Sequence, residues 1–284
     1  MATLTRFVAF ASRSLAVMTT RDLGARFAAL HRKGTPLLMP NPWDAGAAKI
    51  LTSLGFEALA TTSGGFAATL GRLDGSVTRD EALAHSAAIV GATNVPVSAD
   101  LENGFADDPD AVAATVRDAV ATGLAGCSIE DFRDRIYDRS LATDRIAAAA
   151  EAAHAGADVF VLTARAENFI RGNPDLDDTI GRLQSYQAAG ADVVYAPGVS
   201  ALADIRSIVS SVDLPVNVLA LPDAPPVPEL AAAGVARISV GGAFAYAAWG
   251  AVADAARELL GPGTYGFWAG AAKGAQVARA AFSA

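Results

Sequence analysis

At residues 97–104 the chain reads Val97-Ser98-Ala99-Asp100-Leu101-Glu102-Asn103-Gly104, and about thirty residues later it reads Cys127-Ser128-Ile129-Glu130-Asp131. Each segment is a short apolar run of the kind found in strands, which ends in carboxylates and continues into a polar loop. The acids therefore stand at the C-terminal tips of successive strands. Because (β/α)8 barrels build their active sites at that end, the two segments predict a barrel with an acidic mouth.

Strand and helix patterns alternate along most of the remaining chain. Eight apolar runs predict strands at 36–39, 58–61, 95–100, 126–130, 158–163, 192–196, 215–219 and 235–240. Ala-rich amphipathic stretches of helical length lie between them, among them 78–90, 109–121, 143–154 and 176–188. About eight β-then-α units result, which is the number that closes a barrel. We predict an α/β fold, a (β/α)8 TIM barrel in one domain over residues 21–284, with an additional C-terminal helical segment over residues 261–284.

Residues 1–20 differ from the rest of the chain, because they contain Arg6 and Arg13, several Ser and Thr, and no acid. This composition faintly resembles a transit or export segment, although the apolar stretch is interrupted and no clear cleavage pattern follows. The sequence at Met18-Thr19-Thr20-Arg21-Asp22 is that of an ordinary start. We therefore predict a disordered or misassigned leader over residues 1–20.

Composition narrows the classes of partner. The chain has 284 residues, of which 52% are hydrophobic and 18% charged, and its net charge is -8. Without a Lys/Arg cluster, neither a nucleic acid nor an acidic membrane is expected as a partner, so the ligand should be a small molecule. No stretch reaches the roughly eighteen apolar residues of a membrane helix. The only cysteine, Cys127, provides no disulfide framework and no zinc cluster, which favours a reducing, cytoplasmic location.

Polar residues that follow the predicted strands should converge at one mouth. They are Thr61, Thr62, Ser63, Gly64, Gly65, Asp74, Asp100, Glu102, Glu130, Asp131 and Arg165. Magnesium prefers oxygen ligands and keeps several waters, so one direct carboxylate with others behind water suffices for a site. A 2-oxo acid would supply further oxygens, while Arg165 pairs with its carboxylate and the N–H groups of Ser63-Gly64-Gly65 bind its oxygens. We predict a Mg²⁺ site, with Mn²⁺ as the alternative ion.

The ordered set of these segments resembles the isocitrate lyase and phosphoenolpyruvate mutase superfamily. The matching segments are Asn41-Pro42-Trp43-Asp44-Ala45, Thr62-Ser63-Gly64-Gly65, Asp74, residues 98–104, Ser128-Ile129-Glu130-Asp131 and Thr163-Ala164-Arg165. They span roughly residues 21–249, and their order is far more specific than any single match. The resemblance implies a (β/α)8 barrel that binds Mg²⁺, acts on 2-oxo or related carboxylic acids, and forms a homotetramer with an exchanged C-terminal helix.

The resemblance also implies a role for individual residues. Asp100 contacts the metal directly, and Asp74, Glu102 and Glu130 hold it through water. Glu102 replaces the second Asp that is usual in the family, which adds one methylene. The substrate-binding residues implied by the match are Trp43, Ser63, Gly64, Gly65 and Arg165.

The chain departs from the family pattern after the Glu-Asp segment. Carbon–carbon lyases of the family have a gating loop with Lys-Lys/Arg-Cys-Gly-His, and the mutase has Lys-Lys-Asn. Residues 132–140 read Phe-Arg-Asp-Arg-Ile-Tyr-Asp-Arg-Ser instead, without cysteine, lysine or glycine. Gly198 also occupies roughly the place of a substrate-contacting Glu after the sixth strand. These departures argue against ordinary isocitrate lyase, methylisocitrate lyase or phosphoenolpyruvate mutase activity.

Decarboxylation fits the remaining residues best, because it needs a stabilised enolate but takes its final proton from water or a weak acid. The sequence therefore predicts an oxaloacetate decarboxylase-like lyase, with Arg165, Ser63 and Tyr137 as catalytic residues and Tyr137 as a neutral acid in a replacement gate. Three alternatives remain: a methylisocitrate lyase-type enzyme with a different substrate, phosphonopyruvate-type P–C chemistry, and a metabolite-binding barrel without turnover.

Each of these residues also has a purely structural interpretation. The acids would form a solvated rim that caps neighbouring helices, and Arg165 would pair with Glu130 or Glu167. His31, His85 and His154 lie in helical patterns, which favours surface or helix-end positions over catalysis. Asn217 either lines the mouth or satisfies a loop.

Overall fold

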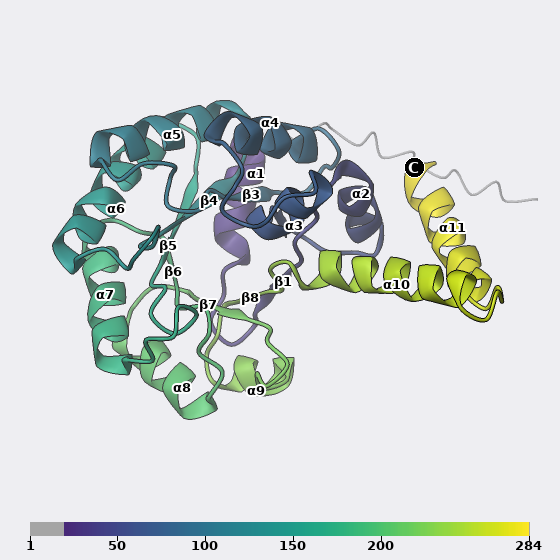
Figure 1. Ribbon diagram of the computed structural model, residues 1–284. Helices are drawn as coiled ribbons and strands as arrows, with labels where there is room; N and C mark the ends of the chain where they lie inside the picture. Colours follow the sequence, from purple (N-terminus) through teal and green to yellow (C-terminus); the bar gives the residue numbers. More distant parts are fainter. Residues whose placement is uncertain (1–19, 284) are drawn as a thin grey trace, which may run out of the picture.

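Eight strands lie side by side in one parallel sheet in the computed structural model, which describes residues 20–283 (Figure 1). The strands are β1 (Leu37–Met39), β2 (Leu59–Ala60), β3 (Val97–Asp100), β4 (Gly126–Glu130), β5 (Val161–Arg165), β6 (Val193–Tyr195), β7 (Val216–Leu219) and β8 (Arg237–Ser239). They pair in the order β1-β8-β7-β6-β5-β4-β3-β2. Between the two end strands, the Ala60 N–H donates to the Pro40 carbonyl at 3.1 Å. The predicted (β/α)8 barrel is confirmed.

Helices separate successive strands and cover the outside of the sheet (Figure 1). Those of the described residues are α1 (Thr20–Leu30), α2 (Ala45–Ser53), α3 (Ser63–Thr69), α4 (Arg79–Val90), α5 (Pro109–Ala121), α6 (Arg139–His154), α7 (Leu176–Ala188), α8 (Leu202–Ser211), α9 (Val227–Ala232), α10 (Ala243–Leu260) and α11 (Trp268–Phe282). Local signals fix several starts, since Thr78 closes a capping box on α4 and Asp108 caps α5 directly before Pro109.

Alternation along the strands separates the core from the site. In β4, Cys127 and Ile129 are fully buried against the helices, whereas Ser128 and Glu130 face the lumen and mouth. Full burial of one such apolar side chain contributes about 1.5–3 kcal/mol. Burial also raises the pKa of the Cys127 thiol, so this residue is an inert part of the core.

The predicted C-terminal helical segment is present as α11, which packs on α2 (Figure 1). Phe282 at its end lines an apolar groove together with Trp43 of the loop before α2 and Phe244 of α10. The long α10 leads away from the barrel and exposes Trp249 and Val252.

Most predicted boundaries agree with the structure to within two residues, and three differ more. In the C-terminal segment predicted over 261–284, the helix is Trp268–Phe282. The fifth strand is Val161–Arg165 instead of 158–163, so Arg165 is the last residue of the strand itself. The helix predicted at 143–154 begins at Arg139. The predicted leader at 1–20 lies outside the described residues except for Thr20, where α1 begins. No helix among residues 20–283 is long and apolar enough to cross a membrane.

Candidate active site at the barrel mouth

Two adjoining cavities lie at the C-terminal ends of the strands. The inner cavity, of about 180 Å³, opens into the lumen and is lined by Asp100, Arg165, Tyr195, Asn217 and Arg237, among others. The outer cavity, of about 520 Å³, lies beneath the βα loops and is lined mainly by charged residues. Three side chains border both cavities: Ser63, Asp74 and Arg165.

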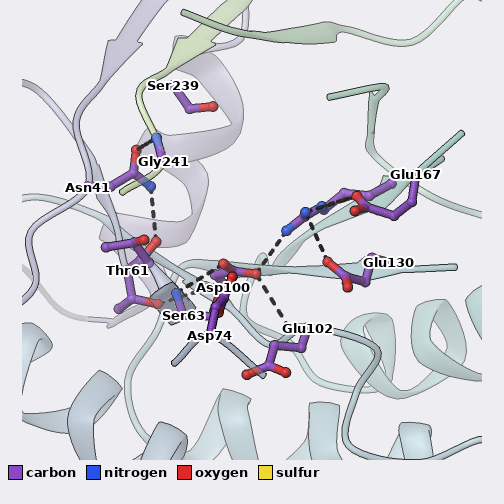
Figure 2. A network of polar contacts seen from close by, with 12 residues as sticks. Asn41, Thr61, Ser63, Asp74, Asp100, Glu102, Glu130, Glu167, Ser239 and Gly241 are labelled. Carbon is purple, nitrogen blue, oxygen red and sulfur yellow. Dashed lines mark hydrogen bonds and ion pairs between the residues drawn. The ribbon is translucent and has the colours of Figure 1, made fainter. Parts of the chain in front are cut away.

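Asp100 is held at the tip of β3 by four neighbours, one of which is Glu102, whose N–H donates to Asp100 Oδ1 at 3.4 Å (Figure 2). The Asp100 N–H donates to Thr61 Oγ1 at 2.9 Å, and its carboxylate Oδ2 accepts the Ser63 N–H at 3.1 Å. The other oxygen, Oδ1, lies 3.0 Å from Nη1 of Arg165. The carboxylate is thus fixed between the first N–H of α3 and a guanidinium, with an edge on the inner cavity.

Arg165 is the centre of the site. The strand register places it beside Glu130 of β4 and Tyr195 of β6, so the three side chains emerge at one level. Nη2 lies 2.9 Å from Oε2 of Glu130 and 2.9 Å from Oε1 of Glu167. Together with Asp100, one arginine thus pairs with three carboxylates. Their charges raise the pKa of Arg165 well above its usual value in spite of burial, so the guanidinium is always charged.

Glu130 and Glu167 are buried carboxylates that share two arginines. Arg171 lies 3.3 Å from each of them, and its guanidinium stacks on the Phe132 ring, 3.8 Å from the centroid. Burial raises the pKa of both glutamates, while the arginines act in the opposite direction. Arg165 therefore has the structural partners that one interpretation of the sequence predicts, and it also faces both cavities.

Glu102 and Asp74 complete the acidic side of the mouth (Figure 2). Glu102 has a left-handed backbone with φ of 49°, an uncommon conformation for a residue with a side chain. Burial raises the pKa of Glu102 to about 7, and the charges of Asp100 and Asp74 contribute to the rise. These three acids therefore repel one another across the boundary between the cavities, which is the electrostatic setting that a cation relieves.

Ser63, Gly64 and Gly65 begin α3 instead of forming a loop. The Ser63 N–H is used by Asp100, and the Gly65 N–H donates to Thr62 Oγ1 at 3.3 Å. Gly64 lines the inner cavity, and within the described residues its N–H has no hydrogen-bond acceptor. A Cβ on Gly64 would lie 3.3 Å from the Asp74 carboxylate and 3.0 Å from the Tyr246 hydroxyl, so only glycine leaves this edge open.

Two residues that the sequence assigns to the site are not brought to it. Trp43 lines the apolar groove beside Phe282 instead of either mouth cavity. The Tyr137 hydroxyl donates to Asp107 and accepts a hydrogen bond from Asn103 Nδ2 at 2.9 Å. The ring of Tyr137 packs under the Arg145 guanidinium, so this side chain anchors the base of the 132–140 segment.

Two residues of the matching segments have an anchoring role that the sequence does not reveal, and Asp131, which is expected at the mouth, lines neither cavity. Asp131 is buried and accepts hydrogen bonds from the Glu167 N–H at 2.8 Å, the Tyr186 hydroxyl at 2.6 Å and Arg182 Nη1 at 3.1 Å. Asn41 accepts from the N–H groups of Val240 and Gly241 and donates to the Thr61 carbonyl (Figure 2). Both residues occur in segments that match the family, but their partners are remote in sequence.

The resemblance places Gly198 roughly at the position of an acidic residue, and the structure leaves no space for a side chain there. Its φ is 92°, and a Cβ would lie 2.6 Å from the backbone nitrogen of Ile170. The loop after β5 therefore occupies the space, and Ile170 lines the inner cavity. This wall of the mouth is apolar.

Comparison with known proteins agrees with this geometry. Residues 27–260 match the family model of phosphoenolpyruvate phosphomutase. The chain belongs to this family. It is therefore an enzyme of the isocitrate lyase/phosphoenolpyruvate mutase superfamily, as the ordered segments predict.

Individual relatives extend the comparison. The crystal structure of a candidate lyase/mutase from Burkholderia cenocepacia J2315 is 48% identical, with a TM-score of 0.84 over 87% of this chain and 91% of that one. An uncharacterized protein of Mycobacterium tuberculosis (strain H37Rv) is 35% identical over 81% of this chain and 87% of its own length. The 2-methylisocitrate lyase of Escherichia coli (strain K12) is 30% identical over 70% of both chains. The family thus includes carbon–carbon lyases.

Proposed function

We propose that the chain is a divalent-cation-dependent lyase that acts on a small 2-oxo acid and breaks the carbon–carbon bond between C3, the carbon next to the carbonyl, and C4, with decarboxylation of an oxaloacetate-like substrate as the preferred reaction. The observation that carries this proposal is the position of Arg165. A permanently charged guanidinium borders both mouth cavities and lies 3.0 Å from Asp100. Arginine suits carboxylate recognition because its fork binds two oxygens at once.

The donor set fits a magnesium or manganese ion. Among residues 20–283, no three His, Cys, Asp or Glu side chains are arranged to enclose a metal ion. Magnesium does not require such a cage, since it retains waters and uses one or two carboxylates together with substrate oxygens. Asp100 would hold the ion directly, with Asp74 and Glu102 alongside. When bound, the ion supplies the positive charge that stabilises an enolate.

The structure does not support the same role for Glu130. Its two carboxylate oxygens pair with Arg165 and Arg171 at 2.9 and 3.3 Å. We therefore assign to Glu130 the role of positioning Arg165. Glu130 would hold the metal ion through water only after one of these two ion pairs is released.

The residues of the chain bind and orient the substrate during decarboxylation. Arg165 pairs with the substrate carboxylate next to the carbonyl, and the Gly64 N–H donates to a substrate oxygen. The bond between C3 and the departing carboxylate carbon breaks and CO₂ leaves. The electron pair of that bond passes into the enolate. C3 then takes a proton from water. This route needs no acid at the position of the missing gate cysteine.

Carbon–carbon lyase activity of the methylisocitrate lyase type is the second candidate, and the Escherichia coli relative favours it. This reaction requires a proton carrier above the substrate. Arg133 and Asp134 of the altered gate line the outer cavity and are the residues available there.

A substrate panel tests these assignments. The purified chain is incubated with Mg²⁺ and, separately, oxaloacetate, 2-methylisocitrate, dimethylmalate and phosphonopyruvate, and release of pyruvate, glyoxylate or phosphate is followed. Pyruvate release from oxaloacetate above the metal-only background, lost in Arg165→Met, is the expected result. Turnover of another panel member alone would assign the chain to that reaction. If no substrate reacts with either Mg²⁺ or Mn²⁺, the barrel is a metabolite-binding protein and the lyase proposal is wrong.

We also propose that the chain assembles as a homo-oligomer through α10 and α11. Their exposed apolar residues support this, among them Tyr246, Trp249, Val252, Leu260 and Trp268. Light scattering at several concentrations tests it, and a monomer at all of them would contradict it.

A further inference from the structure

Arg237 is a second arginine at the mouth, and the proposed chemistry does not use it. It is the first residue of β8, only 2% of it is exposed, and it borders the inner cavity. Its Nε donates to Asn217 Oδ1 at 3.0 Å, and its Nη1 donates to Thr163 Oγ1 at 3.1 Å. A third contact joins Nη1 to Nε2 of His31 at 3.2 Å. Two of these partners, Asn217 and Thr163, carry no charge, and the third, His31, is uncharged when its ring holds one proton.

His31 is held neutral by its two neighbours. Its Nδ1 lies 2.8 Å from the Phe27 carbonyl, which only accepts hydrogen bonds, so Nδ1 carries the proton. Its Nε2 faces a guanidinium, which only donates, so Nε2 must offer its lone pair. Burial and the charge of Arg237 lower the pKa of His31 to about 3. His31 directly follows α1, as the helix-end prediction expects, and it is a partly buried hydrogen-bond acceptor for Arg237.

Arg237 has no counter-ion. Within residues 20–283 it takes part in no ion pair, whereas Arg165 in the same cavity has three carboxylate partners. Burial and the neighbouring charge of Arg165 lower the pKa of Arg237 to about 10, while Tyr195 acts in the opposite direction. A buried charge without an opposite charge is strongly unfavourable. This environment would favour an anion.

One edge of the Arg237 guanidinium has no hydrogen-bond partner among the described residues. Nε and Nη1 make the hydrogen bonds described above, and in the described residues Nη2 makes none. Arg237 lines the inner cavity, so the two N–H groups of Nη2 are the donors that it has left for a ligand there.

The two arginines lie at different depths of one cavity. Thr163, which contacts Arg237, and Arg165 are two residues apart on β5, so their side chains share a face and start about 7 Å apart along the strand. A four-carbon dicarboxylate can bridge such a separation. The inner cavity, at about 180 Å³, has room for a molecule of this size.

We propose that Arg237, supported by Asn217, Thr163 and His31, forms an inner anion site that binds a carboxylate group or a small inorganic anion inside the barrel. If the bound anion belongs to the substrate, an assignment that rests on the proposed function, the site binds the second carboxylate of a dicarboxylic acid whose first carboxylate pairs with Arg165. Selection of dicarboxylic over monocarboxylic acids is the consequence.

Equilibrium binding without turnover tests the inner site. Succinate and butyrate, which have the same chain length but two carboxylates against one, are titrated calorimetrically into the chloride-free chain with Mg²⁺ present. The proteins are wild type, Arg237→Met, Arg237→Lys and the exposed control Arg117→Met. A charge-assisted contact corresponds to about tenfold or more in affinity. We expect Arg237→Met to lose this factor for succinate and to leave butyrate binding unchanged, with partial retention in Arg237→Lys.

Chloride distinguishes the two sources of anion. If an inorganic anion fills the site, chloride raises the melting temperature of the wild type up to a plateau and leaves that of Arg237→Met unchanged. Chloride then also competes with succinate for binding to the wild type. Equal succinate affinity in wild type and Arg237→Met, together with equal chloride responses, would overturn the proposal. Because no product is measured, a chain without lyase activity can still show the site. If Arg237→Met does not fold, the comparison of succinate with butyrate in Arg237→Lys gives the answer.

Discussion

Replacement of Arg165 by methionine removes the cation that three carboxylates share, and the consequence should depend on pH. The lost ion pairs are those to Asp100, Glu130 and Glu167, at 2.9–3.0 Å. Breaking one buried ion pair costs about 3–5 kcal/mol, because the remaining charge is left uncompensated. The three pairs share one guanidinium and are not additive, so we expect a loss of about 3–5 kcal/mol in total.

Protonation determines the pH dependence of this loss. Glu130 and Glu167 already have raised pKa values in the folded protein because they are buried, and Arg165 acts against that rise. Without Arg165, both values rise further. A carboxyl group whose pKa is higher in the folded than in the unfolded protein stabilises the fold at pH values below its unfolded pKa. This stabilisation is lost as the pH rises through the pKa of the group in the folded protein. The destabilisation by Arg165→Met should therefore be larger at about pH 9 than at about pH 6.

Urea denaturation of wild type, Arg165→Met, Arg165→Lys and the exposed control Arg117→Met at the two pH values measures this difference. Arg165→Lys keeps the charge but not the fork, so it should lie between wild type and Arg165→Met. A destabilisation that is below about 1 kcal/mol, or that is the same at both pH values, would refute the assignment of Arg165 as the shared counter-ion.

Three further predictions concern single residues around the mouth. Gly198→Ala should destabilise the fold by clearly more than the about 1–2 kcal/mol of left-handed strain, because its Cβ meets the Ile170 backbone at 2.6 Å. Gly172→Ala, with φ of 80° and open space, is the control in urea denaturation, and equal losses would show that the loop after β5 yields. Glu102→Gln should stabilise the metal-free chain by about 1 kcal/mol above pH 7, after allowance for solvent screening, since an acid whose pKa is raised to about 7 destabilises the fold once ionised. Equal melting temperatures of Glu102→Gln and wild type at about pH 8.5 would contradict this. Tyr137→Phe should lower stability by about 1 kcal/mol through the lost Asp107 and Asn103 contacts and leave kcat unchanged, whereas a large fall in kcat would make Tyr137 the gate acid.

The barrel could be predicted from local signals because those signals are independent and repeated. Helices α5 and α7 agree residue for residue with the predicted ranges, since Asp108 and Pro109 fix one start and Asp175 caps the other. The predicted fifth strand begins three residues too early, because the apolar run starts before the sheet pairing with β4 does.

The parts of the site that sequence reasoning missed depend on distant partners. The sequence predicts His31 as a helix-end residue, and only its contact with Arg237, 206 positions away, connects it to the inner cavity. Asp131 stands in a predicted acidic tip, yet its partners Arg182 and Tyr186 lie about fifty residues further along on α7. Trp43 stands in a segment that matches the family, and Tyr137 stands in the segment that departs from it, but neither observation determines which way a loop turns.

Titration calorimetry of Mg²⁺ into the metal-free chain tests most directly whether acids at the barrel mouth hold a divalent cation. The titration compares wild type with Asp100→Asn, which keeps the size of the side chain and removes its charge. We predict saturable binding to wild type that weakens about tenfold or more in Asp100→Asn. Absence of binding to wild type, or the same affinity in both proteins, would contradict the account.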